Sequence, residues 1–294
     1  MVAALLGIGG LGLFARRQTR LAEPLIDMRL FRRREYAGSV SAALVAMFVT
    51  AALSLMFAQY FQLVLGWSQL SSALAGLPGA AAAVVGGVAA APALARWGHG
   101  RVVPVGLALT GLGCALCLPV DTTANYPVVL VAMLVFGTGA GLSVAVTNHT
   151  VVEALPPGRA GAAAAISETA FEVGGALGIA LIGSVLNAVY RARLVLPSGL
   201  TGEQAGRLRE SIGGALTDAP AMPAESARAV AAARQAFVDG IHVATVACAM
   251  VAVLLAGVTS SAMRAGTDGP AAHRPAHRPK RSSSRPGAEQ TRRS

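Results

Sequence analysis

Two glutamates, Glu168 and Glu172, have the residue type and spacing best suited to chemistry in this sequence. They interrupt a stretch from Gly161 to Val189 that contains no other charged residue. Their i, i+4 spacing puts both carboxyl groups on one face of a helix, about 6 Å apart. Counted from Gly161 at a membrane edge, at about 1.5 Å per residue, Glu168 lies about 10 Å deep and Glu172 about 16 Å deep.

Such a pair can exchange a proton for a cation. An apolar setting and a neighbouring carboxylate each favour the protonated form of a carboxyl group. The apolar stretches contain no Lys or Arg that would neutralise either acid, so a proton, a cationic ligand or another part of the protein must do so. The alternative for each glutamate is a protonated, hydrogen-bonded side chain with a packing role.

Other motifs that resemble chemical sites are better interpreted as packing. Cys114 and Cys117 form a CxxC pair inside an apolar stretch, and no His or carboxylate accompanies them at ligand spacing. The run Gly7–Gly12 fits a dinucleotide-binding pattern but lacks the preceding strand that this pattern requires. We therefore expect no cofactor, no metal and no enzymatic activity. The four-spaced pairs Gly137 with Gly141 and Gly174 with Gly178 predict close approach of membrane helices.

The composition places these residues in a membrane. The chain has 294 residues, a mean hydropathy of +0.59, 54% hydrophobic and only 13% charged residues. No charge occurs from Tyr36 to Ala95, which is longer than any soluble core helix and matches two crossings and a turn. A soluble enzyme is therefore excluded, and because the runs do not alternate, helices are expected rather than barrel strands.

At about 20 residues per crossing, six full spans are expected, roughly at 37–59, 70–94, 103–120, 127–148, 161–189 and 241–261. Residues 1–15 are apolar but too short to cross, and we interpret them as the end of a truncated membrane helix. The predicted organisation is a truncated helix 1–15, a basic linker 16–36, five membrane helices within 37–189, an extracytoplasmic loop 190–239, a last membrane helix 240–261 and a disordered basic tail 262–294. The loop is expected to be amphipathic, with a helix that runs from about Pro223 into the last span.

The basic residues predict the orientation. Residues 16–36 hold seven Arg and residues 262–294 hold eight basic residues, whereas the loops 60–69 and 121–126 hold none. Basic flanks stay on the cytoplasmic side, so the C-terminus is predicted to be cytoplasmic in a multi-pass protein of the plasma (inner) membrane. The net charge of +10 is thus a topology signal, and we expect lipid but no nucleic acid as a partner.

Several separate motifs resemble one family. PPGRAG at 156–161 with ISETAFEVGGALGIALIGSV at 166–185, PLIDMRLFRRREYAG at 24–38 and QYFQLVLGWSQLSSALAGLP at 59–78 are similar to segments of the 14-helix drug:proton antiporters of the major facilitator superfamily. The resemblance implies the C-terminal six-helix half of that fold, preceded by the truncated helix.

The resemblance also implies a function. By position, Glu168 and Glu172 match acids that serve proton coupling or cation binding in the branch that exports quaternary ammonium and other lipophilic cations. Arg96, Gly98 and Arg101 match the superfamily's cytoplasmic loop motif, in which Ala95 replaces an acid. The chain is thus predicted to be the C-terminal part of a proton-coupled multidrug efflux transporter, an antiporter associated with antibiotic resistance.

The partners implied are protons, small lipophilic cations and an N-terminal transporter half that this chain lacks. The alternative is a non-transporting membrane fragment, or an interaction partner of a separately encoded N-terminal half.

Overall fold

The protein is an all-α bundle in the computed structural model, which describes residues 7, 9, 10, 12, 13, 16, 17, 34–123, 125–153, 160–196, 201–218 and 226–267. Within these ranges every regular element is a helix, which confirms the predicted fold class. In chain order they are α2 (Arg34–Gln59), the π-helical turn η2 (Tyr60–Val64), α3 (Gln69–Trp97), α4 (His99–Ala115), α5 (Tyr126–Glu153), α6 (Ala160–Arg193), α7 (Gly202–Glu210), α8 (Ile212–Asp218) and α9 (Ser226–Thr267).

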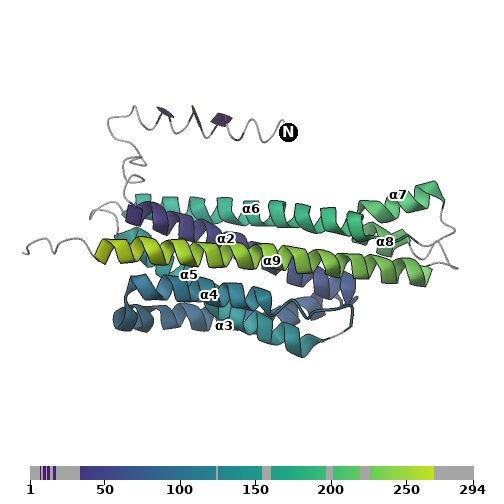
Figure 1. Ribbon diagram of the computed structural model, residues 1–294, viewed down its shortest axis with the longest axis horizontal. Coiled ribbons are helices and arrows are strands. Elements are labelled where there is room, and N and C mark those ends of the chain that lie inside the picture. Colours follow the sequence, from purple (N-terminus) through teal and green to yellow (C-terminus); the bar gives the residue numbers. More distant parts are fainter. Residues whose placement is uncertain are drawn as a thin grey trace, which may run out of the picture.

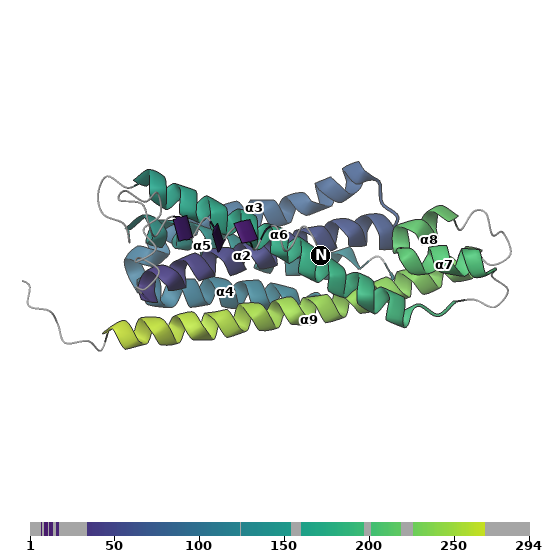
Figure 2. The same cartoon turned by 90° about the horizontal axis from the view of Figure 1, so that it is seen from above.

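The long helices run side by side (Figure 1), and the contacts between neighbouring helices connect them in a ring. Helix α5 packs on α4, α4 on α9, α9 on α6 and α6 on α2, and α2 closes the ring against α5, with α3 packed on the outside of α5. Helices α4 and α9 follow one side of the bundle (Figure 2). One end holds the start of α2 and the α3–α4 junction, and the other holds α7 and α8 (Figure 1). We call these the α3–α4 end and the α7–α8 end.

Five of the described helices are long and apolar enough to cross a membrane, over Val40–Val64, Gln69–Trp97, Tyr126–His149, Ala164–Arg193 and Ala227–Val258. They coincide with five of the six predicted spans. The span predicted at 103–120 is different, because its apolar helix covers only Gly100–Ala115 and ends in a turn over residues 116–119. At about 1.5 Å per residue, α4 as a whole is only about 26 Å long, slightly short of the hydrocarbon core.

The segment predicted as the loop 190–239 contains the helix expected from about Pro223, here the start of α9, and further helix that was not expected. It includes the end of α6, both short helices α7 and α8, and the first fourteen residues of α9, from Ser226 to Asp239. Helix α9 also continues to Thr267, so residues 262–267 of the predicted disordered tail are helical. Residues 268–294 and most of 1–33 lie outside the described residues.

Backbone contact between helices depends on glycine at several positions, among them the four predicted from their spacing. A Cβ atom added to Gly174 would overlap the carbonyl oxygen of Leu44, and one added to Gly178 would overlap that of Phe48, which joins α6 to α2. Helices α5 and α3 meet in the same way. There Gly137 lies against the carbonyl oxygen of Gly79, and Gly141 lies against that of Ala83. Small residues let membrane helices approach this closely, and the contacts fix the rotation of each helix about its axis.

The loop between α4 and α5 is held at the α7–α8 end by two hydrogen bonds from neighbouring elements. The hydroxyl group of Tyr60 in η2 donates to the backbone oxygen of Asp121 at 3.0 Å. A ring nitrogen of His242 in α9 donates to the backbone oxygen of Val120 at 2.7 Å. The turn thereby joins two helices that are far apart in sequence.

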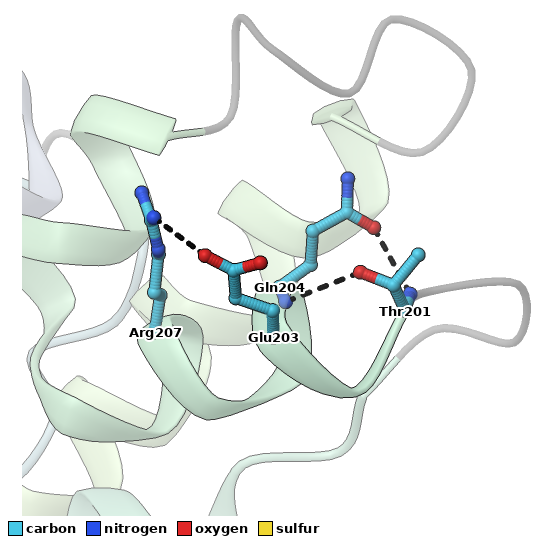
Figure 3. Close-up of polar contacts among 4 residues, drawn as sticks. All are labelled: Thr201, Glu203, Gln204 and Arg207. Carbon is cyan, nitrogen blue, oxygen red and sulfur yellow. Dashed lines mark hydrogen bonds and ion pairs between the residues drawn. The ribbon is translucent and has the colours of Figure 1, made fainter.

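Helix α7 begins with a complete capping box (Figure 3). The Thr201 hydroxyl oxygen accepts from the Gln204 backbone N–H at 3.4 Å, and the Gln204 side-chain oxygen accepts from the Thr201 N–H at 3.0 Å. An exposed ion pair joins Arg207 to Glu203 at 2.8 Å. These local interactions explain why a nine-residue helix forms in a segment that the charge pattern alone suggests is a loop.

The α2–α6 contact predicts the effect of adding one methyl group. Gly178→Ala forces the two backbones apart, and overpacking of this kind costs about 1–3 kcal/mol of folding free energy. The matched control is Gly183→Ala in the same helix, where an added Cβ meets nothing within 4 Å. Thermal unfolding in detergent should show a lower midpoint for Gly178→Ala alone. Equal midpoints for the two variants would contradict the contact.

Candidate functional site

The two glutamates predicted as the site lie on the exposed side of α6. Glu168 and Glu172 are both exposed. Ile166, which precedes them, and Ala170, which lies between them, are buried. The structure thus places the two acids on a common exposed side of the helix, as their spacing requires. Figure 1 shows α6 along one edge of the bundle.

The glycine contacts with α2 determine this direction. Each residue advances an α-helix by about 100°, so Glu172 lies about 200° around the axis from Gly174. Because Gly174 is pressed against α2 at Leu44, Glu172 must point away from the bundle interior. Glu168, one helical turn earlier, points to the same side. The position of the acids is therefore a consequence of the backbone contact on the opposite side.

The surface around the acids is apolar. Val173 follows Glu172 directly and is 39% exposed, and Ile179, about two turns further on the same side of α6, is 49% exposed. An exposed apolar surface of this kind faces lipid, another protein surface or a cavity. A carboxylate is expensive in lipid, so the acids and the apolar residues together indicate a face that protein or water covers at least in part.

Within the described residues, neither carboxylate makes a hydrogen bond or an ion pair. Both are therefore available to a proton or to a cationic ligand. The nearest side-chain hydrogen bond on this helix is local: the Thr169 hydroxyl group donates to the backbone oxygen of Ala165 at 2.7 Å. The arrangement can bind and release a proton, or bind a positively charged group, without breaking any interaction within this part of the chain.

The predicted loop motif forms the α3–α4 junction. Helix α3 ends at Trp97 and α4 begins at His99, so Gly98 alone makes the turn, with φ 72° and ψ 165°. Its N–H donates to the backbone oxygen of Leu94 at 2.9 Å. This region of backbone conformation is essentially restricted to glycine. Arg96 and Arg101 are exposed on either side.

The two predicted groups of site residues do not come together. Helix α6, with Glu168 and Glu172, lies along one edge of the bundle, and the α3–α4 junction lies at the opposite edge (Figure 1). Any cooperation between them would have to pass through the packed helices.

Sequence reasoning missed a group of uncharged polar residues at the α7–α8 end. Gln59, Gln62 and Asn187 line a cavity between α2, η2 and α6. The available signal was amides inside otherwise apolar runs, which a search for charged and metal-binding residues overlooks. As for metals, the described residues include no cluster of three or more His, Cys, Asp or Glu that could hold an ion. Cys114, Cys117 and Cys248 are buried free thiols.

The described bundle, with five helices long and apolar enough to cross a membrane, is that of a polytopic membrane protein. The model of the Major Facilitator Superfamily matches residues 2–179. The multidrug efflux pump LfrA of Mycolicibacterium smegmatis is 35% identical over 88% of this chain and 51% of its own length. The methyl viologen resistance protein SmvA of Salmonella typhimurium is 32% identical over 84% of this chain and 50% of its own length.

The drug efflux pump JefA of Mycobacterium tuberculosis is 33% identical over 66% of this chain and 38% of its own length. This chain therefore belongs to the major facilitator superfamily, among its drug-efflux proteins. It spans about half the length of the relatives with the most extensive matches. Membership of a transporter family indicates a transporter rather than an enzyme.

The conformation of Gly98 predicts that Gly98→Ala is strained. A non-glycine residue in this region costs about 1–3 kcal/mol, so the thermal midpoint in detergent should fall. Gly76→Ala in α3 is the control, because Gly76 lies inside the helix and an added Cβ meets nothing within 4 Å. If Gly98→Ala is as stable as Gly76→Ala, the predicted backbone strain at position 98 is absent and the prediction is wrong.

Proposed function

We propose that this chain is the C-terminal part of a proton-coupled exporter of lipophilic cations. Glu168 and Glu172 alternately hold a proton and attract the cation, and the half-buried ring of Phe171 between them contributes apolar contact area. Relatives named for multidrug efflux and for methyl viologen resistance support this substrate class.

The observation that carries the proposal is a pair of unpartnered carboxylates on a helix of membrane-spanning length. Glu168 and Glu172 lie inside the apolar segment Ala164–Arg193. A charged side chain facing lipid at the bilayer centre costs about 2.5–3.5 kcal/mol even on the lowest scale. A water-accessible substrate path beside α6 removes most of the free-energy cost of placing the two carboxylates in the membrane. In such a path the acids can bind protons and cations.

The exchange needs one site with two states. With the carboxyl groups protonated, the face of α6 is nearly neutral and the cation leaves. When a proton dissociates, the carboxylate attracts the next cation. The site therefore binds either a proton or a cation, but not both at once.

A second six-helix half is part of the proposal, in the same polypeptide or as a separate chain. Transporters of this kind alternate access by rocking two halves around a site near the membrane midplane. The exposed faces of α6 and α3 are suited to this partner, since α3 also presents the exposed apolar residues Leu70, Leu74, Val84 and Val88. We place the α3–α4 end and the C-terminus on the cytoplasmic side of the plasma membrane, because Arg96 and Arg101 flank that junction.

The test uses the complete transporter, with both halves present. Glu172→Gln and Glu168→Gln, made singly, should each lower proton-driven ethidium efflux at least about tenfold, which corresponds to 1.4 kcal/mol. Glu172→Asp should recover part of the activity because it keeps the titrating group. Efflux is measured in cells and in proteoliposomes with an imposed pH gradient.

Glu203→Gln is the matched control, because Glu203 is an exposed acid on α7, outside the membrane-spanning segments. Unchanged efflux in both α6 variants would refute the roles of Glu168 and Glu172. The alternative of a non-transporting chain predicts that adding an N-terminal half to this chain produces no efflux at all.

A further inference from the structure

A cavity of about 540 Å³ lies at the α7–α8 end of the bundle, away from the two glutamates. Its walls come from the last turns of α2, from η2, and from the last turns of α6, and α8 and α9 contribute its remaining sides. Binding sites for small molecules commonly have volumes of about 300–1,000 Å³. The cavity is therefore large enough for a ligand of drug-like size.

The cavity arises where the close contact between α2 and α6 stops. Gly174 and Gly178 let the two backbones touch, but the residues that follow on the same side of α6 are Ile182 and Leu186. Over the same distance α2 passes into η2, whose wider π-helical turn displaces the chain. The two helices separate toward the α7–α8 end, and all the walls of the space between them belong to this chain.

The lining is uncharged but polar. Gln59, Gln62 and Asn187 each line the cavity and are half-buried. Within the described part of the chain their side chains make no hydrogen bond. Each amide offers two N–H donors and one carbonyl acceptor, so a ligand with hydrogen-bonding groups can satisfy them without displacing a protein partner. Leu63, Leu186 and Phe237 supply an apolar wall beside them.

The short helices close the α7–α8 end of this space. Ser211, Ile212 and Gly213 line it. Their position is fixed by Tyr190 near the end of α6, whose buried hydroxyl group donates to the backbone oxygen of Leu208 at 2.7 Å. Leu208 and Ile212 are themselves buried. The cover is therefore docked on α6 in the structure, and the cavity is formed before any ligand enters.

We propose that this cavity, here called the amide pocket, binds uncharged amphipathic molecules that carry an apolar body and hydrogen-bonding groups. Among the described residues its lining includes no charged side chain, which distinguishes it from the Glu168 and Glu172 face proposed to select cations. Eleven residues separate Glu172 from Gly183, so the two sites lie about 16 Å apart along α6. The chain thus carries two sites of different ligand class.

Binding to the purified chain in lipid nanodiscs tests this, because α2, η2, α6, α8 and α9 of this chain all contribute lining residues. Two radiolabelled probes are compared by equilibrium dialysis: chloramphenicol, which is uncharged and has hydroxyl and amide donors, and tetraphenylphosphonium, a cation without donors. The double variant Gln62→Leu with Asn187→Leu should weaken chloramphenicol binding about tenfold, from two hydrogen bonds of about 0.5–1.5 kcal/mol each. It should leave tetraphenylphosphonium binding unchanged.

Glu172→Gln supplies the opposite control and should weaken only the cation. Its failure to do so would count against the proposed function and leave the amide pocket unaffected. The proposal of the amide pocket would be refuted if the double variant left chloramphenicol binding unchanged. It would also be refuted if Glu172→Gln lowered chloramphenicol binding as much as the double variant does. The absence of any chloramphenicol binding to the unmodified chain would refute it as well.

A second variant covers the possibility that the double variant does not fold. Gly183 lines the cavity, and a Cβ added there meets nothing within 4 Å. Gly183→Phe adds a ring to the lining of the pocket and should abolish chloramphenicol binding, and its thermal midpoint is measured to check that the variant is folded. If Gly183→Phe abolishes binding but the folded amide variant does not, the cavity is an apolar site for a lipid chain, and the proposal is wrong.

Discussion

The backbone contact between α2 and α6 determines the geometry of everything else on this side of the bundle. Gly174 and Gly178 allow α6 to lie against the carbonyl oxygens of Leu44 and Phe48. Since a helix cannot rotate without moving all its side chains together, this single contact sends Glu168 and Glu172 to the exposed side. Where the glycines end, the helices separate and a cavity opens. The acidic face and the amide pocket are thus two results of one packing interaction.

The sequence predicted most of the bundle, because membrane helices can be recognised from the length and composition of their apolar segments. The uncharged run from Tyr36 to Ala95 indicated α2 and α3 well, and the i, i+4 spacing of Glu168 and Glu172 predicted their shared side correctly. The helix predicted from about Pro223 into the last span agrees with α9, which begins at Ser226. The short helices α7 and α8 were missed, because hydropathy finds only the part of a helix that lies in lipid.

The pairing of helices and the position of the cavity could not be predicted from the sequence. Four glycines at helical spacing indicate close packing but do not say which helix is the neighbour, so the pairing of α6 with α2 came only from the structure. The amide pocket was missed for the same reason. Gln59 and Asn187 are 128 positions apart in the chain, and nothing local indicates that they line one cavity.

Helix α9 runs without interruption from Ser226 to Thr267, about 63 Å at 1.5 Å per residue. It contains no proline, whereas α3 contains Pro78 and Pro92 within its length. Proline removes a backbone hydrogen bond and makes a helix bend at a defined place. The bundle therefore combines a long helix without proline, α9, with a helix that proline can bend, α3. A rearrangement that keeps α9 intact carries the α7–α8 end and the opposite end along as one piece, and the prolines of α3, together with Pro104 of α4, mark where other helices can bend.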